Sequence, residues 1–181
     1  MIFSTTLGQA VLLLAASATA ANIPNMAKKS TQICFSETTE LHCYSEPDDI
    51  PQDVTEADVK FVAAYLRSYG RQTRAGRLFT MKAADAPDCG EWSLYSRGTV
   101  AAYAKHLDNE VDSSVLFEDI ATTIDGGETT AAHKASIVDC LTEGGSLGVL
   151  VNATHPAYSA ATYTSAGYTP NGILIKIVSS A

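Results

Sequence analysis

Hydrophobic and polar residues alternate along this chain with two different spacings, which distinguish predicted helices from predicted strands. Between residues 55 and 70 the apolar side chains recur about every 3.6 residues, as in an amphipathic helix. Thr55 is a suitable N-cap residue for this helix, and Gly70 is a suitable end. The residues on its apolar side are Val59, Val62, Leu66 and Tyr69, flanked by Phe61 and Tyr65.

Alternation at every second residue predicts strands in the middle and at the end of the chain. Residues 77–82 form a short predicted strand, and Trp92 and Leu94 share one face of the run that follows. The alternation resumes after Gly98, which fits either a strand pair bent at this glycine or one long bulged strand. The strand-like segments of the last third are residues 146–152 and 171–179.

Further helices are predicted between these strands. One is capped by Ser113 or Ser114 and ends at Gly126, and the next covers about residues 130–143. The order is therefore helix, strands, one or two helices, and two strands. This order predicts an α+β fold, a two-layer sandwich of an antiparallel sheet with helices packed mainly on one face.

The beginning of the chain differs from the rest. Residues 1–20 carry no charged side chain and combine an apolar run with small residues near Ala20, which is typical of a secretory signal peptide. A membrane anchor is the alternative, but the apolar run is too short to span a bilayer. We therefore predict a secreted, extracellular protein with an irregular N-terminal arm over residues 21–54 and the sandwich domain over residues 55–181.

The four cysteines form an even set, which in an oxidising compartment predicts disulfides. They are Cys34, Cys43, Cys89 and Cys140. Three pairings are possible, and we favour Cys34 with Cys43 and Cys89 with Cys140. The second pair closes a loop of about fifty residues and by chain entropy would contribute about 4 kcal/mol.

One sequon for N-glycosylation is present, Asn152-Ala153-Thr154. It predicts a single glycan, provided that Asn152 lies at an exposed position.

Charge is unevenly distributed along the chain. The net charge of -8 disfavours nucleic acid or an anionic membrane as the partner of the whole surface. One stretch nevertheless holds six cations and no acid: Lys60, Arg67, Arg71, Arg74, Arg77 and Lys82. This cationic stretch is either a solvated face offset by the acidic remainder, or a binding surface for an acidic polysaccharide, phosphate head groups or an acidic protein.

Catalytic and metal-binding patterns are scarce in the sequence. His106 and His133 are the nearest histidines to Cys89 and Cys140, but disulfide bonding would remove the thiol nucleophile. No zinc-ligand spacing occurs, and the acids Asp48, Asp49 and Asp53 do not match a calcium-binding loop. The carboxylates to inspect for glycoside cleavage are Asp88, Glu91, Glu118 and Asp119. We predict no cofactor, no metal and no catalysis.

Several segments, taken in order, resemble a known family. They are the helix DVKFVAAYLRSYG, the Cys89-Gly90 step, GTVAAYAKHLDNE, the helix ending at IDGG, and NGILIKIV. Over roughly residues 55 to 178 the chain resembles the fungal killer-toxin family of killer protein four and its relatives, and small secreted effectors of plant-infecting fungi. The resemblance implies an α/β sandwich that acts without catalysis on the growth of another organism, in the toxin's case through calcium channels.

Two features of that family differ here. The family is richer in cysteine, and its functional lysine lies close before the Cys-Gly step, whereas Lys82 lies seven residues before Cys89. We expect a monomeric, non-enzymatic effector or toxin-like protein that contacts a cell-surface component of a host plant or competing microbe, an acidic glycan or a protein, without stable membrane insertion. The alternatives are a carbohydrate-binding module that uses the cationic stretch, and a small secreted glycoside hydrolase.

Overall fold

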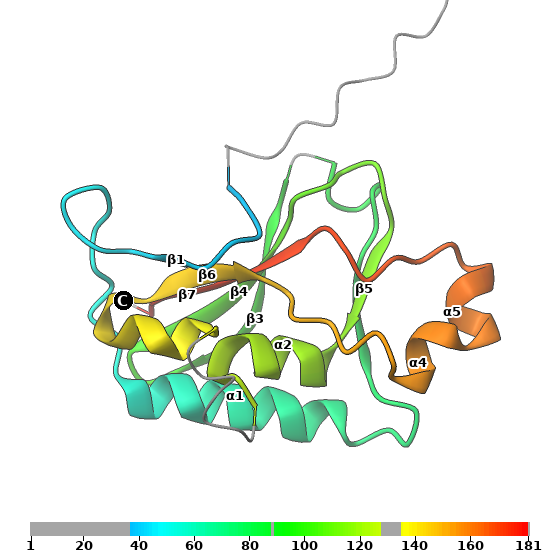
Figure 1. Ribbon diagram of the computed structural model, residues 1–181, viewed down its shortest axis with the longest axis horizontal. Helices are drawn as coiled ribbons and strands as arrows, with labels where there is room; N and C mark the ends of the chain where they lie inside the picture. The colour runs from blue at the N-terminus through cyan, green and yellow to red at the C-terminus, as the bar shows by residue number, and fades with distance from the viewer. Residues whose placement is uncertain (1–36, 88, 128–134, 181) are drawn as a thin grey trace, which may run out of the picture. The chain divides into compact units, whose positions relative to one another are not determined.

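A five-stranded antiparallel sheet forms the centre of the protein (Figure 1). The computed structural model describes residues 37–87, 89–127 and 135–180, which belong to one compact unit. In spatial order the strands are β1 (His42–Cys43), β6 (Gly145–Gly148), β7 (Ile173–Ser179), β4 (Val100–His106) and β3 (Glu91–Arg97). A separate antiparallel pair is formed by β2 (Leu78–Met81) and β5 (Ser113–Leu116).

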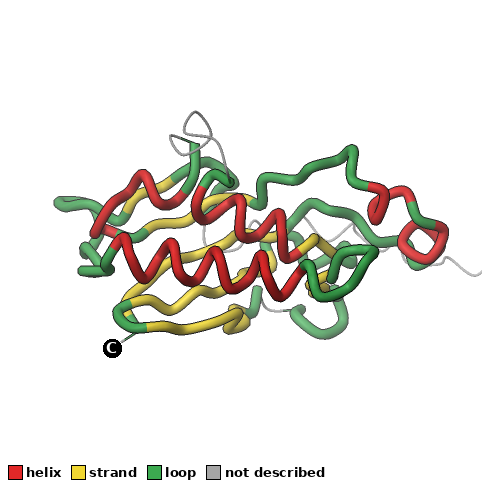
Figure 2. The backbone as a smooth tube through the Cα atoms, turned by 90° about the horizontal axis from the view of Figure 1, so that it is seen from below, coloured by secondary structure: helices red, strands yellow, loops and turns green. Residues whose placement is uncertain are grey.

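Two helices, α1 (Glu56–Gly70) and α2 (Phe117–Asp125), pack next to each other against the sheet (Figure 2). The other helical segments are the 3₁₀ helix η2 (Ile137–Glu143), α4 (Pro156–Ser159) and α5 (Ala161–Ser165). The predicted fold class is therefore confirmed: the protein is an α+β sandwich with an antiparallel sheet and helices packed against it.

The core lies between the sheet and the two long helices. Alternate residues of β4 and β7 point towards the helices and are fully or almost fully buried, because a strand presents every second side chain to the same face. Across the two strands these residues are Val100, Ala102, Ala104, Ile173, Ile175 and Ile177. They pack with the apolar sides of α1 and α2, as the spacings predicted.

Helix α1 begins and ends where the sequence predicts. The hydroxyl oxygen of Thr55 accepts a hydrogen bond from the backbone nitrogen of Asp58 at 3.2 Å, so Thr55 is the N-cap. A Cβ atom at Gly70 would lie only 3.1 Å from the Cβ of Phe117. Glycine at this position thus lets the start of α2 approach the end of α1 closely.

Strands β3 and β4 settle the two alternatives for the run around Gly98. They form an antiparallel hairpin that turns at Gly98, whose φ of 54° lies in the left-handed region that glycine adopts readily. The pairing register also shifts between Ser93 and Tyr95, so β3 carries a bulge as well. The strand pair is therefore the correct alternative.

The predicted cap of the second helix is wrong. Ser113 and Ser114 are buried residues of β5, and α2 begins only at Phe117, after Leu116, which makes no side-chain cap hydrogen bond. This segment pairs with β2, and Ser114 Oγ forms a hydrogen bond with Thr80 Oγ1 of that strand at 2.7 Å instead of capping the helix. The predicted end of α2 at Gly126 is confirmed.

The remaining predicted elements are shorter than expected. The helix expected over residues 130–143 begins outside the described residues, and its described part is the 3₁₀ helix η2, followed by Gly144. The strand expected over residues 146–152 is limited to β6. Residues 37–54 are irregular apart from β1, which adds an edge strand to the sheet.

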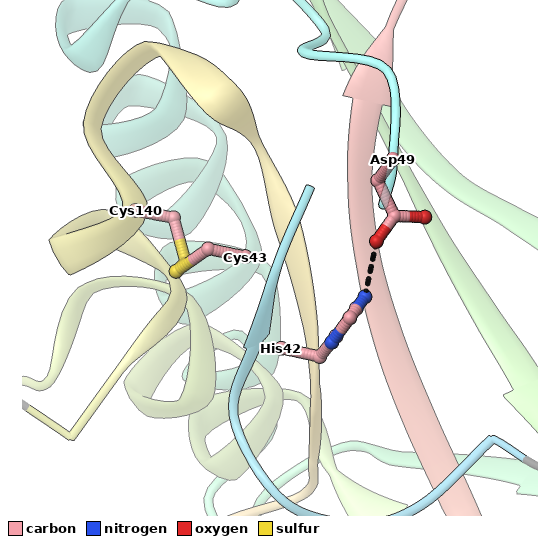
Figure 3. Close-up of a disulfide and its surroundings, with 4 residues drawn as sticks. All are labelled: His42, Cys43, Asp49 and Cys140. Atoms are coloured by element: carbon pink, nitrogen blue, oxygen red, sulfur yellow. Dashed lines mark hydrogen bonds and ion pairs between the residues drawn. A yellow bond between two sulfur atoms is a disulfide. The ribbon is translucent and has the colours of Figure 1, made fainter. Parts of the chain in front are cut away.

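The disulfide pairing favoured from the sequence is wrong. Cys43 of β1 is bonded to Cys140 of η2, across a sequence separation of 97 residues (Figure 3). Cys89 is also disulfide-bonded, and Cys34 lies outside the described residues. Pairing of β1 with β6 places Cys43 next to η2, and this proximity cannot be read from spacing along the chain.

Within the part of the chain that the structure describes, no helix is long and apolar enough to cross a bilayer. The predicted signal peptide, residues 1–20, lies outside the described residues.

Candidate functional site

A cavity of about 590 Å³ lies beside the first turn of α2. Its walls come from the second half of α1, from α2, from the chain that follows β6, and from His155 just before α4. The polar residues that line it are Arg67, Arg71, Glu118, Asp119, Thr122, Asn152 and His155. A concave site with several converging polar groups is the kind of place where proteins bind small ligands or ligand segments.

Asp119 is the most buried acid of this cavity, with 5 % of its surface exposed. Its Oδ2 atom accepts a hydrogen bond from the Tyr158 hydroxyl at 2.5 Å and another from the backbone nitrogen of Asn152 at 3.2 Å. Its Oδ1 atom has no hydrogen-bond partner among the described residues and remains available to a ligand.

The protonation states in this cluster follow from burial. Burial raises the pKa of Asp119, although the hydrogen bonds from Tyr158 and Asn152 act in the opposite direction. Burial also raises the pKa of Tyr158 far above its usual range, and the hydrogen bond to Asp119 raises it further. Tyr158 therefore stays a neutral donor to Asp119, and its oxygen accepts a hydrogen bond from the backbone nitrogen of Leu116 at 2.9 Å.

Two ion pairs join α1 to α2 at the cavity. Arg67 forms a bidentate pair with Asp125, at 2.9 and 2.5 Å, and both side chains are largely buried. Arg71 Nε lies 2.6 Å from Glu118 Oε1, in a more exposed position. These pairs fix the two arginines and leave the lining nearly neutral, so the cavity suits a polar ligand more than a strongly charged one.

The structure separates the residues of the cationic stretch. Only Arg67 and Arg71 line the cavity. Lys60 pairs with Glu56 on the exposed side of α1, and the Arg77 guanidinium lies 3.9 Å from the centre of the Tyr69 ring. Arg74 and Lys82 are exposed.

The four carboxylates selected from the sequence are also separated. Glu118 and Asp119 both line the cavity, whereas Glu91 lies on the other face of the sheet, with its Oε1 2.8 Å from Lys176 Nζ. Asp88 lies outside the described residues. The two cavity acids are adjacent in sequence and come from the same helical turn.

The acids considered for calcium do not converge either. Asp49 accepts a hydrogen bond from His42 Nε2 at 2.7 Å, close to the disulfide (Figure 3). Among the described residues, no group of three or more histidine, cysteine or acidic side chains is placed to hold a metal ion.

The histidine and cysteine candidates lie away from the cavity. His106 is fully buried, and its Nε2 lies 3.0 Å from the equally buried Ser113 Oγ. Burial lowers the pKa of His106, so the imidazole stays neutral. No described cysteine has a free thiol, and His133 lies outside the described residues.

Sequence reasoning missed Tyr158 and His155. Both come from a segment rich in serine, threonine and tyrosine whose apolar residues show neither the helix nor the strand spacing. Pro156 is the signal that was available, because proline is favoured in the first turn of a helix and α4 begins there. The contact between Tyr158 and Asp119 joins residues 39 positions apart, which no local pattern indicates.

Comparison of this chain with protein-family models, with curated proteins and with solved structures finds no match in any of the three.

Proposed function

We propose that this protein is secreted and acts without catalysis on another organism, by binding a cell-surface component of that organism in the cavity beside α2. Export is supported by the signal-peptide pattern of residues 1–20 and is consistent with the Cys43–Cys140 disulfide. The effector or toxin-like role is supported by the family resemblance of the sequence.

The observation that carries the binding proposal is the state of Asp119. One carboxylate oxygen is fixed by Tyr158 and Asn152, and the other is left for a ligand. A buried acceptor held in this way is pre-organised, so the protein loses little conformational freedom when a ligand hydroxyl or amine binds to it. Arg71 and His155 line the same cavity.

The test compares two arginines near the end of α1. Arg71 lines the cavity, whereas Arg74 is exposed and lies outside it. Purified, unglycosylated protein is incubated with microbial and plant cells, and the bound fraction and cell growth are measured. We expect Arg71→Ala to lower binding several-fold and Arg74→Ala to leave it unchanged.

The same pair of variants separates the cavity from the cationic stretch. If both variants lose binding equally, and retention on pectin or heparin falls with them, the cationic stretch is the binding surface and the cavity is not. A wild-type protein that binds no cells and changes no growth at any dose contradicts the proposal as a whole.

A small glycoside hydrolase is the second candidate, and one observation favours it. Asp119 has a raised pKa and lies in a cavity beside Glu118, and glycosidases use a protonated carboxyl group to donate a proton to the leaving oxygen. Release of reducing ends from cell-wall polysaccharides by the wild type, lost in Asp119→Asn, would establish this activity. Absence of such release would remove the hydrolase from consideration.

A further inference from the structure

The sequon Asn152-Ala153-Thr154 lies at the cavity, and its three residues are exposed. It occupies a turn between the chain that follows β6 and α4, closed by a hydrogen bond from the His155 nitrogen to the Asn152 carbonyl oxygen at 2.9 Å. Exposure in a surface turn is what a modifying enzyme requires of such a site. Here the turn also forms part of the wall around Asp119.

The side chains of the sequon leave the reactive atom of Asn152 accessible. Asn152 Oδ1 accepts hydrogen bonds from the Thr154 hydroxyl at 2.7 Å and from the Thr154 nitrogen at 3.3 Å. The amide nitrogen Nδ2, to which a glycan would be joined, is engaged in neither bond. The Asn152 backbone nitrogen donates a hydrogen bond to Asp119 Oδ2, and this bond fixes Asn152 at the cavity wall.

We propose that Asn152 carries an N-linked oligosaccharide and that this glycan covers the opening of the cavity. The cavity is then open in the unmodified chain and covered in the glycosylated chain. This inference rests on the export that the proposed function includes, and it adds a means of regulating the same site.

The modification is a transfer from a lipid-linked oligosaccharide pyrophosphate. The bond between the first sugar carbon, C1, and the pyrophosphate oxygen breaks, and a bond between C1 and Asn152 Nδ2 forms. Nδ2 gives up one proton, and the lipid pyrophosphate leaves with the electron pair of the broken bond. No oxidant or reductant takes part.

The glycan would shield a neighbour whose reactivity can be measured. His155 lines the cavity three residues after Asn152, and its Nδ1 accepts a hydrogen bond from the Ala157 nitrogen at 3.2 Å. Diethyl pyrocarbonate acylates neutral imidazoles, so the labelling rate of His155 reports access to the cavity. His42 is exposed, lies on β1 outside this cavity, and serves as a reference in the same sample.

The first experiment tests the modification. The full chain is expressed in a yeast secretory host, and the exported protein is analysed by mass spectrometry before and after enzymatic glycan removal, which converts a glycosylated Asn152 to Asp. We expect a glycan on the wild type and on Thr154→Ser, and none on Thr154→Ala or Asn152→Gln. Export without a glycan on the wild type overturns the proposal, and failure of export overturns its premise as well.

The second experiment tests the covering of the cavity. We expect His155 to be labelled several-fold more slowly in the glycosylated protein than in enzymatically deglycosylated protein or in Thr154→Ala, with His42 unchanged. Equal His155 rates in a protein shown to carry the glycan overturn the covering. Neither experiment needs a ligand, so they stand or fall separately from the binding test on Arg71.

Discussion

One face of the five-stranded sheet packs against α1 and α2, whereas the opposite face carries a cluster of charges. On the helix side, β4 and β7 present alanine, valine and isoleucine to the core. On the other side the same two strands present Lys105 and Lys176, which pair with Glu91 of β3 and with Glu37, a residue that precedes β1.

Each face of the sheet has buried residues at its centre, but different interactions compensate for their removal from water. Ile175 is fully buried by apolar contacts, and Lys105 retains only 4 % of its exposed surface although it is charged. A buried charge is tolerated only where opposite charges and hydrogen bonds replace water. On β7 the helix side is therefore stabilised by burial of apolar surface, whereas the outer face combines the ion pairs of Lys176 with the buried side chain of Leu174.

Removal of the disulfide should have the largest effect, because it ties the chain before α1 to the helical layer. The double variant Cys43→Ala and Cys140→Ala removes a cross-link between residues 97 positions apart and should lower the free energy of unfolding by about 5 kcal/mol. Urea unfolding measures the loss. Hydrogen exchange should rise first in residues 37–54, and exchange unchanged there would mean that the ion pairs alone hold this segment.

Truncation on the helix side should come next. Ile175→Ala leaves a cavity between the sheet and the helices and should lower stability by about 3 kcal/mol. Val178→Ala is a matched control on the other face of the same strand, where the side chain is only half-buried. Thermal unfolding measures the stability of both variants. A loss of stability in Val178→Ala as large as in Ile175→Ala would show that burial in the apolar core is not the main contribution of this strand.

Removal of one charge on the opposite face should cost less. In Lys105→Met, Glu37 and Glu91 have only Lys176 as a cationic partner among the described residues. The variant should lower stability by about 2 kcal/mol. This is less than the loss expected for a fully buried ion pair, because the two acids are partly exposed. Adding Glu37→Gln should restore part of the loss, since the remaining charges balance. Lys60→Ala breaks an exposed pair and should have almost no effect.

An unrestored loss in that double variant would contradict the ionic account. It would show that the loss comes from the missing ammonium group itself and not from the excess of acids, because methionine keeps most of the aliphatic length of lysine.

The sequence predicts the helix-covered face well and the charged face poorly. The apolar spacing of α1 and the strict alternation of isoleucine in β7 follow from helix and strand geometry, so both elements and the fold class are confirmed. The same alternation places Lys176 on the outer face, but nothing in it indicates Glu37 as a partner, because that contact joins distant parts of the chain.

The candidate site depends even more on distant contacts. The sequence indicates Glu118 and Asp119 as candidate acids, and Arg67 and Arg71 as members of the cationic stretch, but it does not show that the four residues line one cavity. The Arg67–Asp125 pair spans 58 residues, and no local periodicity indicates it. Disulfide pairing failed for the same reason, since four cysteines allow three pairings and only the fold brings Cys43 beside Cys140.

Acid should act on the two faces in separate pH windows, with the smallest effects of the series. On the helix side, burial lowers the pKa of His106, although Asp108 and Asp112 oppose this. The unfolded chain therefore binds a proton first, and the stability that depends on neutral His106 is present above about pH 6.5 and is lost as the pH falls towards the lower pKa of the folded state.

On the charged face the window lies lower. Burial raises the pKa of Glu37, but hydrogen bonds from Lys105 and Lys176 outweigh this and leave it below its ordinary value. The stability from ionised Glu37 is therefore present above about pH 4.3 and is lost as the pH falls through the folded-state pKa. The free energy of unfolding, measured against pH, should have a smaller slope near pH 6 in His106→Gln than in the wild type, and a smaller slope near pH 4 in Glu37→Gln. If either variant removed the slope belonging to the other face, the two faces would not titrate independently, and the charge cluster would be coupled to the core.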